Sequence, residues 1–213
     1  MALANNGDLQ SAVQSWMNRN ESGFTAMIPD FIALAEAELN SRVRVRQNMT
    51  TAALTLVAWN DYVALPTDFL EDVELNYTIS AQLLLKASYN DIDRIRGEAV
   101  AGQPSLYAIN GTNINFERDA DASYALTLRY YEAWAIATDS TNWLLTTHPD
   151  AYLFGALAEA HGWLGDANAA QWARGKMEAA IQRALTADSR TRGAPLRVDA
   201  ALLRRSSYNI LTD

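Results

Sequence analysis

Apolar residues follow a helical period near both ends of this chain and an alternating period in its middle, and this order limits the folds that it can adopt. One helical stripe runs through residues 9–17 and another through residues 172–185. Between them, residues 73–79 and 124–131 alternate apolar with polar side chains, as half-buried strands do. Helices and strands that are segregated along a sequence are typical of α+β domains.

The N-terminal part of the chain predicts two helices. Asp8 is the expected cap of the first helix, and residues 18–23 are expected to form a loop. The second helix is expected to begin near Pro29, because a proline in the first turn costs no hydrogen bond.

The middle of the chain predicts antiparallel strands. Asn110-Gly111 is the clearest signal, because Asn-Gly supplies the two positive-φ positions of a tight hairpin between residues 106–109 and 114–116. Asn90 or Asp91 is expected to cap a short helix. The other expected strands cover residues 54–56, 62–65, 73–79, 82–86 and 124–131.

The last third of the chain predicts an antiparallel helical hairpin. Thr146 or Thr147 is expected to cap a helix that ends before Gly165, and Asp166 is expected to open a second helix that ends near Gly193.

The sequence therefore predicts an α+β fold with N-terminal helices, a central antiparallel β region with hairpins, a C-terminal helical hairpin and an extended C-terminal arm. Residues 1–193 are expected to form one domain, with helices at about residues 8–46 and 147–192 and a β-rich insertion at about residues 50–135. Residues 194–213 are expected to form the arm.

Charge is distributed unevenly along the chain. The net charge is -8, which argues against a nucleic-acid binder, since phosphate contacts need a basic face. Five arginines and three aspartates give residues 188–213 a net charge of +2, which leaves -10 for the rest. A basic end on an acidic body favours a segment that docks on a partner, although an ordinary loose terminus is the alternative. No signal peptide or membrane-spanning run is expected.

The sequence predicts no catalytic, metal or cofactor site. Cysteine is absent and there are two histidines, which excludes thiolate chemistry and disfavours metal clusters. His148 and His161 are thirteen residues apart and would not share a helix face, and His148 is interpreted as a surface residue at a helix start. Glu36 and Glu38 also lie on different faces of one helix.

The six tryptophans fall into two groups. Core packing is the expected explanation for Trp16, Trp163 and Trp172, which lie in predicted helices. Trp59 lies in a predicted turn and Trp143 before a predicted helix, where exposed aromatic residues often anchor interfaces. We therefore expect a subunit interface at these two residues. The alternative is a local contact, such as Trp143 against its own helix.

The chain resembles the head-to-tail adaptor (connector) proteins of short-tailed phages. The resemblance spans about residues 7–198, and the shared order of its stretches is more specific than any one of them. The matching stretches are residues 8–19, 28–46, 63–70, 102–109, 124–131, 141–145 and 149–160. Residues 198–213 match no stretch of the family.

This resemblance implies a structural virion protein, found in the neck of the particle and assembled in the host cytoplasm. It implies a dodecameric ring of identical copies that joins the portal protein to a tail nozzle or tail tube protein. Genome DNA would pass through the ring without sequence-specific binding. The portal-binding residues are then expected on the basic arm, at Arg197, Leu202, Leu203, Arg204, Arg205 and Tyr208.

Two other functions are weighed against this one. A virion-associated peptidoglycan-degrading enzyme would use Glu159 or Glu36 as its acid, but no partner carboxylate is apparent. A small regulatory or chaperone-like binder would stay monomeric beside portal rings.

Overall fold

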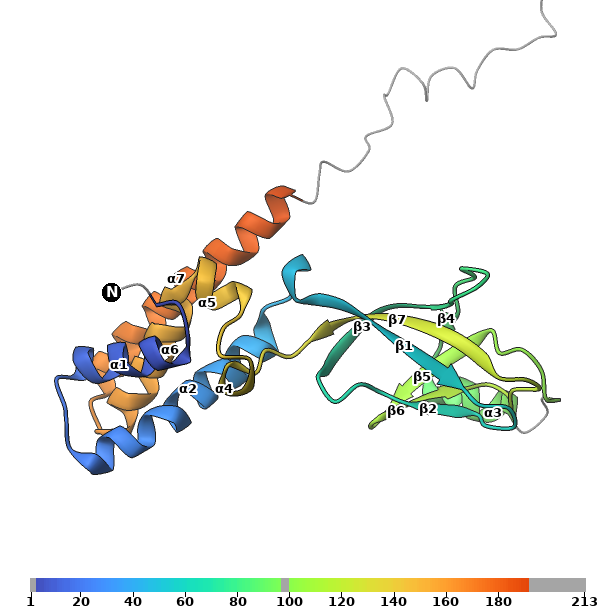
Figure 1. Cartoon of the computed structure of the whole chain (residues 1–213), viewed down its shortest axis with the longest axis horizontal. Helices are drawn as coiled ribbons and strands as arrows, with labels where there is room; N and C mark the ends of the chain where they lie inside the picture. The colour runs from blue at the N-terminus through green and yellow to red at the C-terminus, as the bar shows by residue number, and fades with distance from the viewer. Residues whose placement is uncertain (1–2, 97–99, 192–213) are drawn as a thin grey trace, which may run out of the picture.

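The computed structural model describes residues 3–96 and 100–191, which form a helical body and a β-rich body arranged end to end (Figure 1). The α+β class predicted from the sequence is confirmed. The helices are α1 (Asn6–Met17), α2 (Ser22–Arg42), α3 (Tyr89–Arg96), α4 (Ile136–Asp139), α5 (Trp143–Thr147), α6 (Pro149–Trp163) and α7 (Ala167–Thr191), with a 3₁₀ turn η1 at Arg46–Asn48. The strands are β1 (Met49–Leu56), β2 (Tyr62–Ala64), β3 (Phe69–Tyr77), β4 (Leu85–Lys86), β5 (Leu106–Asn110), β6 (Asn113–Phe116) and β7 (Tyr124–Glu132). Within the described ranges, no helix is both long and apolar enough to cross a membrane.

The helical body is built around α6, which is lined with small residues. Gly155 lies where α6 meets α2 and α7, and a Cβ atom there would come within 2.8 Å of Ala35 Cβ and 3.3 Å of Met177 Cε. Because Gly155 has no side chain, the three helices approach closely and bury Ala156 and Leu157 between them.

The starts of the first two helices differ from the sequence prediction. The cap of α1 is Asn5, whose Oδ1 accepts the Asp8 N–H at 2.9 Å, so Asp8 lies in the first turn instead. Helix α2 begins at Ser22, so a start near Pro29 was wrong. Proline removes the hydrogen bond to the Thr25 carbonyl, but Thr25 is exposed and water can replace that donor.

The β-rich body contains two sheets, of strand order β1-β7-β3 and β2-β6-β5-β4. The buried face of the first carries Leu126, Leu128 and Tyr130 of β7, which share one face as predicted. Strands β1 and β2 follow each other in sequence but pair with β7 and β6 respectively, so the turn at Trp59 passes from one sheet to the other. Helix α3 confirms the predicted short helix.

The predicted hairpin is present as β5 and β6, but its turn lies one residue later. Asn110 pairs with Asn113, so Gly111 and Thr112 are the central residues. Gly111 has φ of +59°, whereas Asn110 is not in the positive-φ region. A positive-φ glycine at the first central position suits a II′ hairpin, which needs only one such residue.

The chain crosses between the two bodies twice, and the side chains of half-buried Asn40 and buried Asn48 hold the crossings together. Asn40 Nδ2 donates to the Trp134 carbonyl and its Oδ1 accepts the Trp134 N–H, both at 2.9 Å. Asn48 accepts the Val45 N–H at 3.1 Å and donates to the Glu132 carbonyl at 3.4 Å. The outgoing and returning segments are therefore fixed side by side.

The C-terminal helical hairpin is formed by α6 and α7, as predicted. Gly165 has φ of +77° between them, and Asp166 Oδ1 accepts the Ala169 N–H at 3.0 Å. The expected cap at Thr146 or Thr147 was wrong, because both residues belong to α5 and His148 precedes α6. His148 is also half-buried rather than a surface residue, since its ring packs edge-on against Trp143 at 5.7 Å.

We predict opposite consequences for the same substitution at two helical glycines. Gly175 in α7 has open space at its Cβ position, so Gly175→Ala is expected to raise the free energy of unfolding by up to about 1 kcal/mol. Gly155→Ala improves the helix propensity equally. It is nevertheless expected to be about 1–3 kcal/mol less stable than Gly175→Ala, because its Cβ would overlap Ala35. Urea unfolding of the two variants measures the difference, and equal stabilities would show that α2 and α6 are not tightly packed at Gly155.

Candidate functional site

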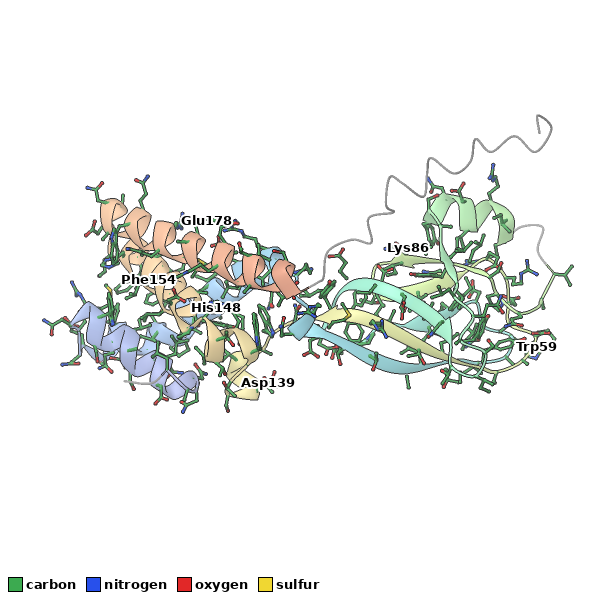
Figure 2. The ribbon with its side chains drawn as sticks, turned by 90° about the horizontal axis from the view of Figure 1, so that it is seen from above. Trp59, Lys86, Asp139, His148, Phe154 and Glu178 are labelled. Atoms are coloured by element: carbon green, nitrogen blue, oxygen red, sulfur yellow. The ribbon has the colours of Figure 1, made fainter. Side chains whose placement is uncertain are left out.

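Trp59 is the most exposed tryptophan of the chain, with 72% of its surface accessible. It lies at the end of the β-rich body away from the helices, as Figure 2 shows. The backbone N–H of Trp59 donates to the Ala120 carbonyl at 2.7 Å, and the backbone N–H of Ala120 donates to the Asn60 carbonyl at 3.1 Å. The turn is therefore held by backbone bonds, which present the indole ring to solvent.

The backbone of Trp59 is strained, with φ of +67°. A bulky residue with a Cβ rarely adopts the left-handed region, at a cost of roughly 1–3 kcal/mol. An exposed indole ring contributes little to folding that would offset this cost. Both features favour a contact made by Trp59 outside the subunit, and its place in an interface stays a prediction.

Trp143 lies in a different setting, at the first position of α5. It is half-buried, and its ring lies edge-on to His148 at 5.7 Å. This is the local contact that the sequence left as an alternative. Trp143 also lines a hollow between the two bodies, so it is partly accessible.

The hollow at the junction has a volume of about 820 Å³ and an acidic lining. Asp68, Glu132 and Asp139 contribute carboxylates to it, from the β2–β3 connection, the end of β7 and α4. Burial raises the pKa of Glu132, and the negative charges of Asp68 and Asp139 raise it further. Across residues 3–96 and 100–191, no three acidic or histidine side chains are placed to hold a metal ion.

Three tryptophans lie at the surface of the helical body, where the sequence predicted core positions. Trp16, Trp163 and Trp172 are 56%, 53% and 50% exposed. Trp16 and Trp172 each pack edge-on against Phe154 at 5.6 Å, and Trp163 packs on Phe24 and Phe31. The prediction was wrong because the periodicity of a helix gives the direction of a side chain but not whether another helix covers it.

The six residues expected to bind a portal lie outside the described ranges. They are Arg197, Leu202, Leu203, Arg204, Arg205 and Tyr208. The structure therefore neither brings them together nor separates them, and their role stays a prediction.

Glu36 was weighed as a catalytic acid, and it is enclosed where three segments meet. One carboxylate oxygen accepts the Ile136 N–H at 2.9 Å and the Tyr152 hydroxyl at 2.8 Å. The Tyr152 hydroxyl in turn accepts an N–H of Asn142 at 2.6 Å. Burial raises the pKa of Glu36, and Asp139 adds to this, while the two hydrogen bonds oppose it. The arrangement ties α2 to α6 and to the α4–α5 region.

Glu159, the other candidate acid, is placed on the outside of α6. It forms an ion pair with Arg174 of α7 at 3.2 Å, which joins the two helices of the hairpin. Both glutamates thus have structural partners among the described residues, whereas glycoside hydrolysis needs two carboxyl groups that flank the bond to be cut.

We predict that Trp59→Gly is more stable than Trp59→Ala by about 1 kcal/mol, because glycine adopts positive φ without strain and alanine does not. Both variants remove the indole ring, so their difference in urea unfolding isolates the backbone strain. Equal stability would mean that the turn relaxes and that no strain is held at Trp59.

We predict that Glu36→Gln gains stability over the natural protein as pH rises. The folded-state pKa of Glu36 lies above its ordinary value, so its proton is bound more tightly in the folded protein. The resulting stability is complete below the unfolded-state pKa and is lost as pH rises through the folded-state pKa. Glutamine keeps an accepting oxygen but does not ionise, so its stability has no such loss.

Urea unfolding at several pH values from about 4 to about 8 measures this effect, because this range begins near the ordinary pKa of a glutamate and extends above it. Glu36→Ala is the control, because it leaves the Ile136 N–H and the Tyr152 hydroxyl without their acceptor and should lose about 1–3 kcal/mol at every pH. A constant difference between Glu36→Gln and the natural protein would contradict the prediction.

Comparison with known proteins places this arrangement in a family. No curated protein matches the chain. The sequence model of the SU10 adaptor protein family matches residues 4–199, a range that includes both bodies and all described helices and strands. The resemblance seen in the sequence is thus confirmed: the chain belongs to the SU10 adaptor protein family, a family of phage head-to-tail adaptor proteins.

Proposed function

We propose that this phage adaptor joins the portal protein to a tail nozzle or tail tube protein and forms part of the conduit for genome DNA. The observation that carries the proposal is the family match across both bodies of the chain. The elongated shape supports it, because a subunit with two bodies end to end can contact different partners at its two ends (Figure 1). The adaptor would then lie in the neck of the virion, after assembly in the host cytoplasm.

A ring of twelve copies would match the symmetry that the resemblance implies for the portal. Each copy in a closed ring uses two different faces, one for each neighbour. The surface offers separate aromatic positions for such contacts. Trp16 and Trp172 lie on the helical body, whereas Trp59 lies at the far end of the β-rich body.

The charge of the chain suits a conduit. The net charge outside residues 188–213 is -10, so a lumen built from this chain would repel phosphates rather than hold them. DNA that is not gripped can slide, and no sequence-specific contact is needed for passage.

We propose that residues 1–193 act as the adaptor domain and residues 194–213 as the arm that docks on the portal. The docking residues would be Arg197, Leu202, Leu203, Arg204, Arg205 and Tyr208. The arm carries three arginines and two aspartates, a net charge of +1 beside an acidic body, which suits an acidic surface on the portal.

We also infer a structural rather than an enzymatic role. Membership of an adaptor family supports this, and both candidate acids have structural partners within the chain. A peptidoglycan zymogram tests the inference, and a lytic band that Glu159→Gln abolishes would overturn it.

We predict that Arg204→Ala/Arg205→Ala weakens association with purified portal rings at least about fivefold at low salt, with the difference shrinking as salt rises. Electron microscopy of the mixture counts portals that carry a second ring, and a titration gives the affinity.

The control is Arg94→Ala/Arg174→Ala, which changes the net charge equally at side chains that are 79% and 62% exposed on α3 and α7. This variant should join the portal as the natural protein does. Equal weakening of the two double variants would show that overall charge, not the arm, governs docking. No second ring with the natural protein at any salt would overturn the proposed function.

A further inference from the structure

The two sheets of the β-rich body have four edge strands, and three of them are protected against pairing with another chain. Strands β2 and β4 are three and two residues long. Strand β3 is long but has irregular pairing at two places, between Phe69 and Glu71 and between Asp72 and Glu74. Short strands, bulges and charges are the devices that proteins use to keep sheet edges from pairing.

The edge of β3 is also covered and charged. The Leu84 N–H donates to the Leu75 carbonyl at 2.9 Å, and the Tyr77 N–H donates to the Gln82 carbonyl at 3.0 Å. Closer to its start, Asp72 binds Lys86 of β4 at 2.5 Å. A second strand could not approach this edge without displacing these groups.

Strand β1 has none of these protections. Its eight residues, Met-Thr-Thr-Ala-Ala-Leu-Thr-Leu, include no charge, proline or glycine, and its pairing with β7 is regular over the whole length. Within residues 3–96 and 100–191, β7 is its single strand partner. Every second residue of such a strand turns its N–H and C=O away from β7. Figure 2 shows β1 along one border of the β-rich body, opposite β3.

We propose that β1 pairs with β1 of a second copy of this chain, antiparallel and about a two-fold axis, in the free protein. Two identical strands meet themselves in this arrangement, so a charge near the centre of β1 would face its own copy and repel it. The absence of charge from all eight residues removes that repulsion. The β3 edge, with Glu71, Asp72 and Glu74, would oppose self-pairing.

The sequence of β1 also fits itself in one register. Both residues of a facing pair must lie on the same side of the sheet, so the pair numbers must differ by an even number. With Ala53 opposite Ala53 of the second copy, exposed Thr51 faces Thr55. On the buried side, Ala52 then faces Leu54. Pairs of threonines and of small apolar residues are favourable across strands.

The proposed dimer is closed. Pairing through β1 gives a six-stranded sheet whose outer edges are the two copies of β3, which are protected, so association stops at two copies. The contact uses the same surface on both copies and cannot repeat around a ring. It therefore concerns the protein before assembly, and it does not depend on the proposed portal function.

Light scattering and sedimentation equilibrium of the full chain over a range of concentrations test the proposal. The natural protein should show a monomer–dimer equilibrium, and Ala53→Lys, at an exposed position, should weaken dimerisation at least about tenfold, since two lysines then face each other. The control is Val73→Lys on β3, at another exposed position, which should dimerise as the natural protein does. A monomer at every concentration, or equal loss in both variants, would overturn the proposal.

Cysteine crosslinking gives a second measurement that does not depend on the stability of the lysine variants. The natural chain has no cysteine, so a single introduced thiol reports on one position. Oxidised Ala53→Cys should form a covalent dimer, because facing Cβ atoms in antiparallel strands lie close enough for a disulfide, whereas Val73→Cys should not. Crosslinking of Val73→Cys alone would place the contact on the other edge. Ala53→Lys should still join portal rings, so failure of the dimer and failure of the adaptor role are told apart.

Discussion

Two asparagine side chains carry the constraint on which the two-body structure depends. The β-rich body is an insertion between α2 and α4, so the chain must leave the helices and return at nearly the same place. Asn40 and Asn48 bind the returning backbone at Trp134 and Glu132 through three hydrogen bonds, and a fourth joins Asn48 to the outgoing backbone at Val45. These amides satisfy partly buried backbone groups, and an apolar residue at either position would remove those hydrogen bonds. The clamp therefore couples two hydrophobic cores that have separate sets of residues.

This coupling explains why the polar network of the helical body lies close to the junction. Glu36, four residues before Asn40, accepts the N–H of Ile136, two residues after Trp134. Tyr152 then extends the network to α6, and Arg46 reaches Asp188 near the end of α7 at 3.0 Å. The contacts of Ile136 and Arg46 join the returning and outgoing segments to α2 and α7, and the contact of Tyr152 joins α6 to α2. The β-rich body is thus held by several helices at its base, while Trp59 lies at its opposite end.

The sequence predicted most elements but not the contacts between them. Periods of apolar residues located β7, α3 and the α6–α7 hairpin, because these patterns report which face of one element is buried. Pro29 suggested the wrong start for α2, because a proline is tolerated inside a helix where the lost hydrogen bond faces water. Asn110-Gly111 suggested a turn one residue too early, because this hairpin needs only one residue with positive φ. The partners of Glu36 lie 100 and 116 residues away, so no spacing rule could identify them. Exposed Trp16, Trp163 and Trp172 were missed because periodicity shows the direction of a side chain and not whether another helix covers it.

The surface of the chain separates two kinds of association. Ring assembly needs two different patches of the surface of each subunit. The exposed aromatic residues of the helical body and of the β-rich body lie far apart and could belong to two such patches. The β1 edge is a self-complementary surface, because it is uncharged and its threonines and alanines can face their own copies. A contact between identical surfaces is complete once two copies have paired, so no third copy can add to it. A subunit that buries β1 in a pair would therefore keep its aromatic faces free, so that pairing and ring assembly draw on different parts of the same molecule.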